Sequence, residues 1–233
     1  MIHNEIDDQS GVILIDHLKI NDSKRTLVNQ RGTTSMDIDL QPSMTATGHV
    51  FMRDIDTNET LVDQHNDIHL ENFSEAIALS LANYDKGVIE EMHFGNGGTL
   101  VTSTDEIHYS PPVVTGQTAD LYNPTYVKVV NNRSSNFKSD AAKVNVATHH
   151  VVGTRYTDIV VTCTLDYGEP ADQLVFDNAD TTSNSYIFDE LGLKSHDVSL
   201  GVKRLLTHVI FHPVQKSLNR AIEVVYTIRI TMV

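Results

Sequence analysis

The chain ends in a stretch with a clear alternation of side-chain types, Ala221–Met232, which reads AIEVVYTIRITM. One parity of this stretch is apolar throughout: Ile222, Val224, Tyr226, Ile228, Ile230 and Met232. The other parity is polar apart from one valine: Glu223, Val225, Thr227, Arg229 and Thr231. Successive side chains of a β-strand point to opposite faces, so this pattern predicts a long strand with one face in a core and the other in water.

Other parts of the chain have strand-like patterns too. Strands are predicted over these ranges: 49–55, 60–64, 88–94, 122–130, 144–152, 158–167, 186–193 and 205–213. One helix is predicted near 72–83, with Asn72 as its N-cap and Glu75 reaching back to it. Pro213 is expected to end its strand or to lie at a sheet edge. Because 205–213 is apolar on both faces, these elements predict a mainly β fold with two packed sheets: an antiparallel β-sandwich, jelly-roll-like, with one inserted α-helix and long polar loops.

The N-terminal part of the chain differs in composition from the rest. Residues 11–20 (GVILIDHLKI) have the pattern of a first strand, and residues 21–43 are rich in Asp, Asn, Ser and Thr. Such polar segments usually need a partner to order them. We therefore expect residues 1–44 to form an N-terminal strand and extended arm, and residues 45–233 to form the β-sandwich domain.

Charge and cysteine content exclude several classes of protein. The net charge of −14 argues against non-specific nucleic-acid binding through a basic patch. Residues 1–110 carry 19 acidic and 6 basic side chains, whereas residues 201–233 carry 1 and 5, so copies of the chain could pack head to tail; a solvated acidic surface is the alternative. A single cysteine, Cys163, allows no intramolecular disulfide and is expected in the core. The absence of an apolar run and of a basic, then apolar, start predicts neither a membrane span nor a signal peptide.

One group of side chains has the composition of a metal site. His65 and His69 are four residues apart, with Glu71 close by, and two histidines at that spacing on a helix chelate zinc. However, the pair precedes the predicted helix, and Asn66 stands where the catalytic motif requires glutamate. The sequence therefore predicts no metal, cofactor or catalytic residue, while a metal-dependent hydrolase that uses His65 and His69 stays open as an alternative.

Three further groups are predicted to be structural. The turn Gly95–Gly98 lacks the lysine of a phosphate-binding loop, and we expect Gly97 and Gly98 to supply positive φ angles there. Glu90 and Glu91 are adjacent on a predicted strand and should face opposite ways, which makes them a poor acid–base pair. Two histidines of one strand, at 208 and 212, lie about 13 Å apart at the rise of a strand, too far to share an ion.

Several segments occur in an order that resembles the virion structural proteins of tailed bacteriophages, over roughly residues 45–232. These segments are His65–Asn66 before the helix, then Met92–Gly98 (MHFGNGG), Phe188–Leu193 (FDELGL), Leu205–Lys216 (LLTHVIFHPVQK) and Val224–Ile230 (VVYTIRI). The resemblance implies a non-enzymatic part of a symmetric assembly. Residues 1–44 lie outside it.

The expected function is that of a virion structural protein that forms a homo-oligomer in the neck, tail or baseplate, assembled in the host bacterial cytoplasm. A capsid decoration or head-fibre protein is an alternative, as is the hydrolase above. Expected partners are copies of the chain and other virion proteins, with no nucleic acid, membrane or small-molecule substrate. We expect loops 21–43, 103–120 and 131–143 to form the interaction surfaces.

Overall fold

The computed structural model describes residues 43–84, 86–104, 106–131, 143–170, 185–196 and 202–233. The predicted first strand and arm, residues 11–42, lie outside the described residues, as does most of the predicted interaction loop 131–143. Residues from Ser43 to Val233 form one compact unit.

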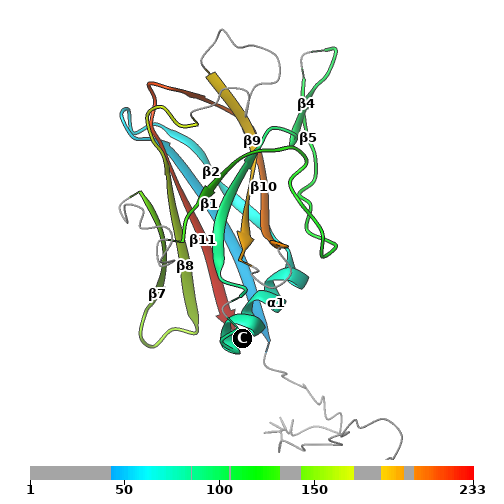
Figure 1. Cartoon of the computed structure of the whole chain (residues 1–233), viewed down its shortest axis with the longest axis vertical. Helices are drawn as coiled ribbons and strands as arrows, with labels where there is room; N and C mark the ends of the chain where they lie inside the picture. Colours follow the sequence, from blue (N-terminus) through cyan, green and yellow to red (C-terminus); the bar gives the residue numbers. More distant parts are fainter. Residues whose placement is uncertain (1–42, 85, 105, 132–142, 171–184, 197–201) are drawn as a thin grey trace, which may run out of the picture. The chain divides into compact units, whose positions relative to one another are not determined.

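Eleven strands and one helix make up the described unit (Figure 1). The elements are β1 (Met44–Asp54), β2 (Thr60–Ile68), α1 (Leu70–Leu81), β3 (Ile89–Gly95), β4 (Thr99–Val101), β5 (Ile107–Tyr109), β6 (Pro124–Val129), β7 (Val144–His150), β8 (Tyr156–Leu165), β9 (Ser185–Ser195), β10 (Leu205–Ser217) and β11 (Ile222–Met232). Nine strands form one curled sheet in the order β6-β3-β9-β10-β2-β1-β11-β8-β7, and β4 pairs with β5 in a separate hairpin. The predicted mainly β, antiparallel fold with one inserted helix is confirmed.

The sheet has two halves that share strand β2. Most of β2 pairs with β1, from Thr60 to Asn66, but its last two residues, Asp67 and Ile68, pair with β10 instead. The strand therefore passes from one half-sheet to the other at its end, which gives the sandwich-like arrangement without two separate sheets.

The core lies between the two halves of the sheet. Strand β11, with β1 on one side and β8 on the other, alternates as predicted: Ile222, Val224, Tyr226 and Ile228 are all fully buried. Cys163 on β8 is also buried, and burial raises the pKa of its thiol to about 12, in keeping with the predicted core role. The first seven residues of β10, Leu205–Phe211, are buried on both faces, as their apolar sequence predicts.

Helix α1 begins earlier than the sequence suggested. Its N-cap is His69, whose Nδ1 accepts a hydrogen bond from the Asn72 backbone N–H at 3.3 Å. Asn72, the predicted cap, lies inside the first turn, and its side chain donates to the Leu205 carbonyl. An imidazole can accept as a carboxamide does, so the predicted cap residue was wrong although the helix was right. The predicted stop at Asn83 fits its positive φ of 57°.

Pro213 does not end its strand, so that expectation was wrong, but the alternative of an edge position fits, because β10 pairs with β2 only at Thr207 and His208 and beyond them pairs with β9 alone. Strand β10 continues to Ser217, and its pairing with β9 is irregular around the proline: Ile210 pairs with Glu190, but Val214 pairs with Phe188. A bulge leaves residues outside the hydrogen-bond ladder, so the missing N–H of a proline costs nothing there.

Candidate functional site

Two pairs of adjacent acidic residues lie on the outer face of β3 and β9, the face turned away from the core. On β3 the core side chains are Ile89, Met92 and Phe94, so the alternation shifts by one residue at Glu90 and Glu91. The pairing shows the same shift, because Ile89 lies opposite Ser195 while Glu91 lies opposite Lys194. This bulge directs both carboxylates to the same side. The expectation that Glu90 and Glu91 face opposite ways was therefore wrong.

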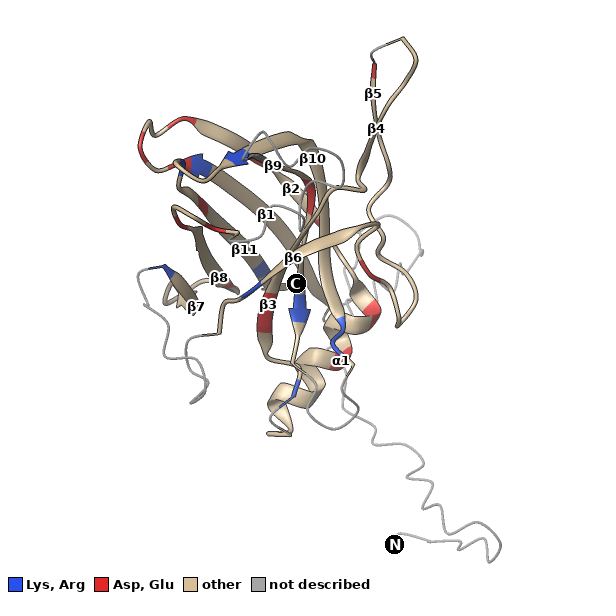
Figure 2. Ribbon diagram, turned by 45° about the horizontal axis from the view of Figure 1, so that its top comes forward, with Lys and Arg blue, Asp and Glu red and all other residues tan. Residues whose placement is uncertain are grey.

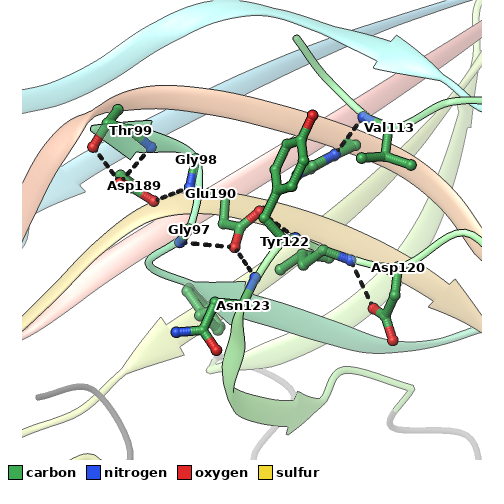
Figure 3. Close-up of polar contacts among 12 residues, drawn as sticks. Gly97, Gly98, Thr99, Val113, Asp120, Tyr122, Asn123, Asp189 and Glu190 are labelled. Atoms are coloured by element: carbon green, nitrogen blue, oxygen red, sulfur yellow. Dashed lines mark hydrogen bonds and ion pairs between the residues drawn. The ribbon is translucent and has the colours of Figure 1, made fainter. Parts of the chain in front are cut away.

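The second acidic pair, Asp189 and Glu190, occupies an equivalent break on β9. Core side chains stand at Tyr186 and Phe188 before it, and at Leu191 after it. The break coincides with the irregular pairing around Pro213. Both acids turn toward the backbone of Gly97–Thr99, as Figure 3 shows, and both are almost completely buried.

Glu190 is fully buried and has four hydrogen-bond donors around its carboxylate. Its Oε1 accepts from the backbone N–H groups of Gly97 at 3.0 Å and Asn123 at 2.8 Å. Its Oε2 accepts from the Tyr122 N–H at 2.9 Å and from His208 Nε2 at 3.0 Å. Burial alone would raise the pKa of Glu190, but these donors outweigh it and lower the pKa below its usual value. The carboxylate is therefore ionised, with its oxygens already occupied.

The contacts of His208 define its tautomer. Its Nδ1 accepts from the backbone N–H of Val113 at 2.8 Å, and a backbone N–H can only donate. The ring proton is therefore on Nε2, which donates to Glu190. His208 is fully buried, and its ring packs 5.9 Å from that of Tyr122. The imidazole links two parts of one loop to β10 as a neutral group.

Asp189 holds the start of β4. Its Oδ1 accepts from the Gly98 N–H at 2.9 Å, and its Oδ2 accepts from the Thr99 N–H at 2.8 Å and from the Thr99 hydroxyl. The turn Gly95–Gly98 thus presents N–H groups to anions, as a phosphate-binding loop does, but the anions are two carboxylates of the same chain.

Glycine is required in this turn for close approach, and the expectation of positive φ at Gly97 and Gly98 was wrong. The described glycines with positive φ are elsewhere: Gly87, Gly116, Gly153 and Gly168. A Cβ atom on Gly97 would lie 2.7 Å from Tyr122 Cβ, and one on Gly95 would lie 2.4 Å from Glu190 Oε1. Any larger residue would push the turn away from the carboxylate that it binds.

The loop of residues 110–123, here named the strap, runs over the outer face. Side chains of the sheet and of the α1 N-cap hold it at successive points: His208 at Val113, His69 at Gly116, Arg204 at Gln117, Lys194 at Asp120, and Glu190 at Tyr122 and Asn123. Most of the predicted interaction loop 103–120 is therefore tied to its own sheet, and the β4–β5 hairpin is the part that stands clear (Figure 1).

The acids of β3 hold another segment. Lys203 Nζ pairs with Glu90 at 3.2 Å and also with Glu91, while His196 Nδ1 lies 2.6 Å from Glu90. His93 Nε2 lies 2.9 Å from Glu91. Burial works to raise the pKa of Glu91, but its bonds to His93 and Lys203 lower it to about 2. A carboxyl group with so low a pKa is ionised at pH 7, so it acts as an ion-pair partner rather than as a proton donor.

The structure does not bring His65 and His69 into one ligand set. His65 is exposed on β2, with Nδ1 3.2 Å from the Gly48 carbonyl. His69 is buried, and both of its ring nitrogens have partners, Asn72 N–H and the Gly116 carbonyl. His212 is exposed and contacts the Tyr109 hydroxyl, away from the buried His208. Among the residues that the structure describes, no group of three or more His, Cys, Asp or Glu side chains could hold a metal ion.

Sequence reasoning missed Asp189, Glu190 and His208 as a group, although the sequence carried a signal. In both YIFDELGL and IEEMHF, two consecutive acids interrupt a period-two apolar pattern, and the apolar parity changes across them. Such a change is the sequence trace of a bulge.

No protein-family model, curated protein or solved structure matches this chain. Within the described residues, no helix combines the length and the apolar content needed to cross a membrane.

Proposed function

We propose that this chain is a non-enzymatic structural component of a tailed-phage virion, where it forms a homo-oligomer in the neck, tail or baseplate. One observation carries the proposal: three segments with the virion-protein resemblance meet in a single structural centre. Met92–Gly98 contributes the Gly97 N–H, Phe188–Leu193 contributes Glu190, and Leu205–Lys216 contributes His208. The resemblance therefore rests on a contiguous unit rather than on scattered strands.

The chemistry of this centre supports a structural role. The buried carboxylates Asp189 and Glu190 bind backbone N–H groups of their own chain, and Glu91 is paired with Lys203. Carboxylates whose oxygens are already bound within their own chain position loops. General acid–base catalysis instead needs a side chain whose pKa lies near the working pH. The expected partners remain other copies of the chain and other virion proteins, and the expected location remains the virion.

A capsid decoration or head-fibre protein is the second candidate, and the projecting β4–β5 hairpin favours it, since such a protein must present a feature to the shell. The hydrolase alternative gains no support from the described residues, because both ring nitrogens of His69 are engaged within the chain.

Labelled electron microscopy tests the proposal. A gold-labelled antibody against this chain should decorate the neck, tail or baseplate of the phage particles that contain it. Labelling of the capsid shell would favour the decoration protein instead. Particles that lack the chain entirely would overturn both, and stoichiometric bound metal that is lost in His69→Ala would revive the hydrolase.

A further inference from the structure

Two histidines of strand β10 hold the segment that leads from β5 into the strap. His208 Nδ1 accepts a hydrogen bond from the Val113 N–H at 2.8 Å, and Figure 3 marks this bond. Further along β10, His212 Nδ1 lies 3.2 Å from the Tyr109 hydroxyl. Tyr109 is the last residue of the β4–β5 hairpin, which projects from the sheet (Figures 1 and 2). Both contacts therefore lie where the chain leaves the hairpin and enters the strap.

These two contacts respond differently to a proton. A backbone N–H can only donate, so the Val113 bond exists only while His208 Nδ1 carries a lone pair. A proton on that nitrogen would place two N–H groups against each other and break the bond. A tyrosine hydroxyl can both donate and accept, so the contact of Tyr109 survives a proton on His212. Of the two contacts, the one at Val113 is therefore the one that acid breaks.

The surroundings of His208 favour a positive charge on its ring. Three titratable groups lie around it: Glu190 on β9, Asp67 opposite it in the register with β2, and Tyr122 in the strap. The other recorded donors to Glu190 are backbone N–H groups, so the described contacts of this buried carboxylate include no cation. A proton on His208 would make its bond to Glu190 charge-assisted, which is about twice as strong as a neutral hydrogen bond. Burial of the ring opposes a charge, whereas the two carboxylates stabilise it.

The part of the strap next to Val113 is lightly held. Residues 111–115 lie between two anchored points, the base of the hairpin and the contact with the α1 N-cap. Among the described residues, two side chains bond to this segment: His208 at Val113, and the Tyr122 hydroxyl at the Pro111 carbonyl. None of the residues 111–115 is buried. Loss of the His208 bond therefore lets the segment move into water without opening the core.

We propose that His208 acts as a pH switch, which holds Val113 of the strap at neutral pH and releases it in acid. A proton from water binds His208 Nδ1, the Nε2–H bond to Glu190 stays, and the Val113 N–H loses its acceptor. A histidine in water takes up its proton near about pH 6.5, so release is expected between about pH 7 and about pH 5. Acid thereby loosens the strap beside the β4–β5 hairpin and leaves the sheet intact. The inference depends on the fold and not on the virion role.

Nuclear magnetic resonance on the full chain, labelled with ¹⁵N, tests this switch between about pH 7.5 and about pH 5. The chemical shifts of the two His208 ring nitrogens should report proton uptake. The Val113 amide peak should move with the same midpoint. Hydrogen exchange at Val113, corrected for the intrinsic effect of pH, should become at least about tenfold faster at the acid end, while the amides of β11 stay protected.

Two matched variants on β10 separate this switch from other titrations. His208→Gln keeps a group that can donate and accept but cannot take up a proton in this range, so Val113 should show no acid transition. His212→Gln, at an exposed position on the same strand, should behave as the native chain does.

The proposal is wrong if His208 keeps its proton on Nε2 alone down to about pH 5 and Val113 does not change. It is also wrong if His208 takes up a proton while the Val113 amide stays protected, or if the transition at Val113 persists in His208→Gln. The first two results are read on the native chain, so they decide the matter even when His208→Gln does not fold.

Discussion

The two faces of strand β9 are buried in different ways. On the inner face, Phe188, Leu191 and Leu193 pack against other apolar side chains in the core. On the outer face, Glu190 and Lys194 are equally buried, but they hold the strap through hydrogen bonds and an ion pair. The inner face therefore holds the strands together, whereas the outer face specifies where loops lie.

The two kinds of burial differ in how strictly they fix the positions of the groups in contact. Apolar burial stabilises in proportion to area and tolerates some repacking. A buried carboxylate is stable only while each of its donors stays in place, because an unpaired buried charge costs several kcal/mol. Breaking the inner face should therefore lower global stability, and breaking the outer face should also displace particular loops.

The largest effect is expected on the inner face. Phe188 is fully buried between Phe94 and Phe211, with ring centroids at 5.4 and 5.9 Å. Phe188→Ala should lower the free energy of unfolding by about 4 kcal/mol, because it leaves a cavity. Denaturant unfolding measures this, with the 65% exposed Tyr84→Ala as control. A loss no larger than that of the control would show that this face is not close-packed.

Glu190→Gln should disrupt the contacts between the outer face and the strap and lower the free energy of unfolding by about 3 kcal/mol. The new NH₂ group cannot accept, so at least one backbone N–H among Gly97, Tyr122 and Asn123 loses its acceptor. Hydrogen exchange should show lost protection at Tyr122 and Asn123 while the amides of β11 stay protected. Glu106→Gln, at an exposed carboxylate, is the matched control. Unchanged protection in the strap would contradict the role given to Glu190.

Gly97→Ala should lower the free energy of unfolding by a smaller amount, about 2 kcal/mol, because its Cβ would clash with Tyr122 and Asn123. The loss should appear in the same strap amides as for Glu190→Gln. In the double variant the two losses should not add, because both act on one contact. Additive losses would mean that the turn and the carboxylate act independently.

The smallest effect concerns pH. The folded pKa of Glu91 is about 2, below its ordinary value of 4.5, so its ionised form stabilises the fold. That contribution is fully present above about pH 4.5 and is lost as the pH falls toward 2. Glu91→Gln should cost about 1 kcal/mol at pH 7, and the difference from the native chain should shrink toward zero near pH 2. A difference that stays constant with pH would remove the ion pair as its cause.

Much of the fold was predictable because the strands follow local rules. The burial of β11 matches the alternation in AIEVVYTIRITM from Ile222 to Ile228, whereas Met232 at the end of the strand is exposed. The doubly apolar start of β10 is buried on both faces. The helix was placed correctly, but its cap was not, since the acceptor role of His69 depends on the Gly116 carbonyl that fixes its other nitrogen. That carbonyl belongs to a loop whose path no local pattern defines.

Most strands along the chain and the single helix were determined by the sequence itself, because period and turn chemistry are properties of short segments. The β4–β5 hairpin was not predicted, and β5 lies inside the range 103–120 that was expected to be a loop. Only the tertiary structure decided what the acidic pairs do. Gly98 and Asp189 are 91 residues apart, and their contact exists because β3 and β9 are neighbours in the sheet. Whether an acid in a strand meets donors or water depends on such distant pairings, so the physical reason for its burial cannot be read from its own neighbours.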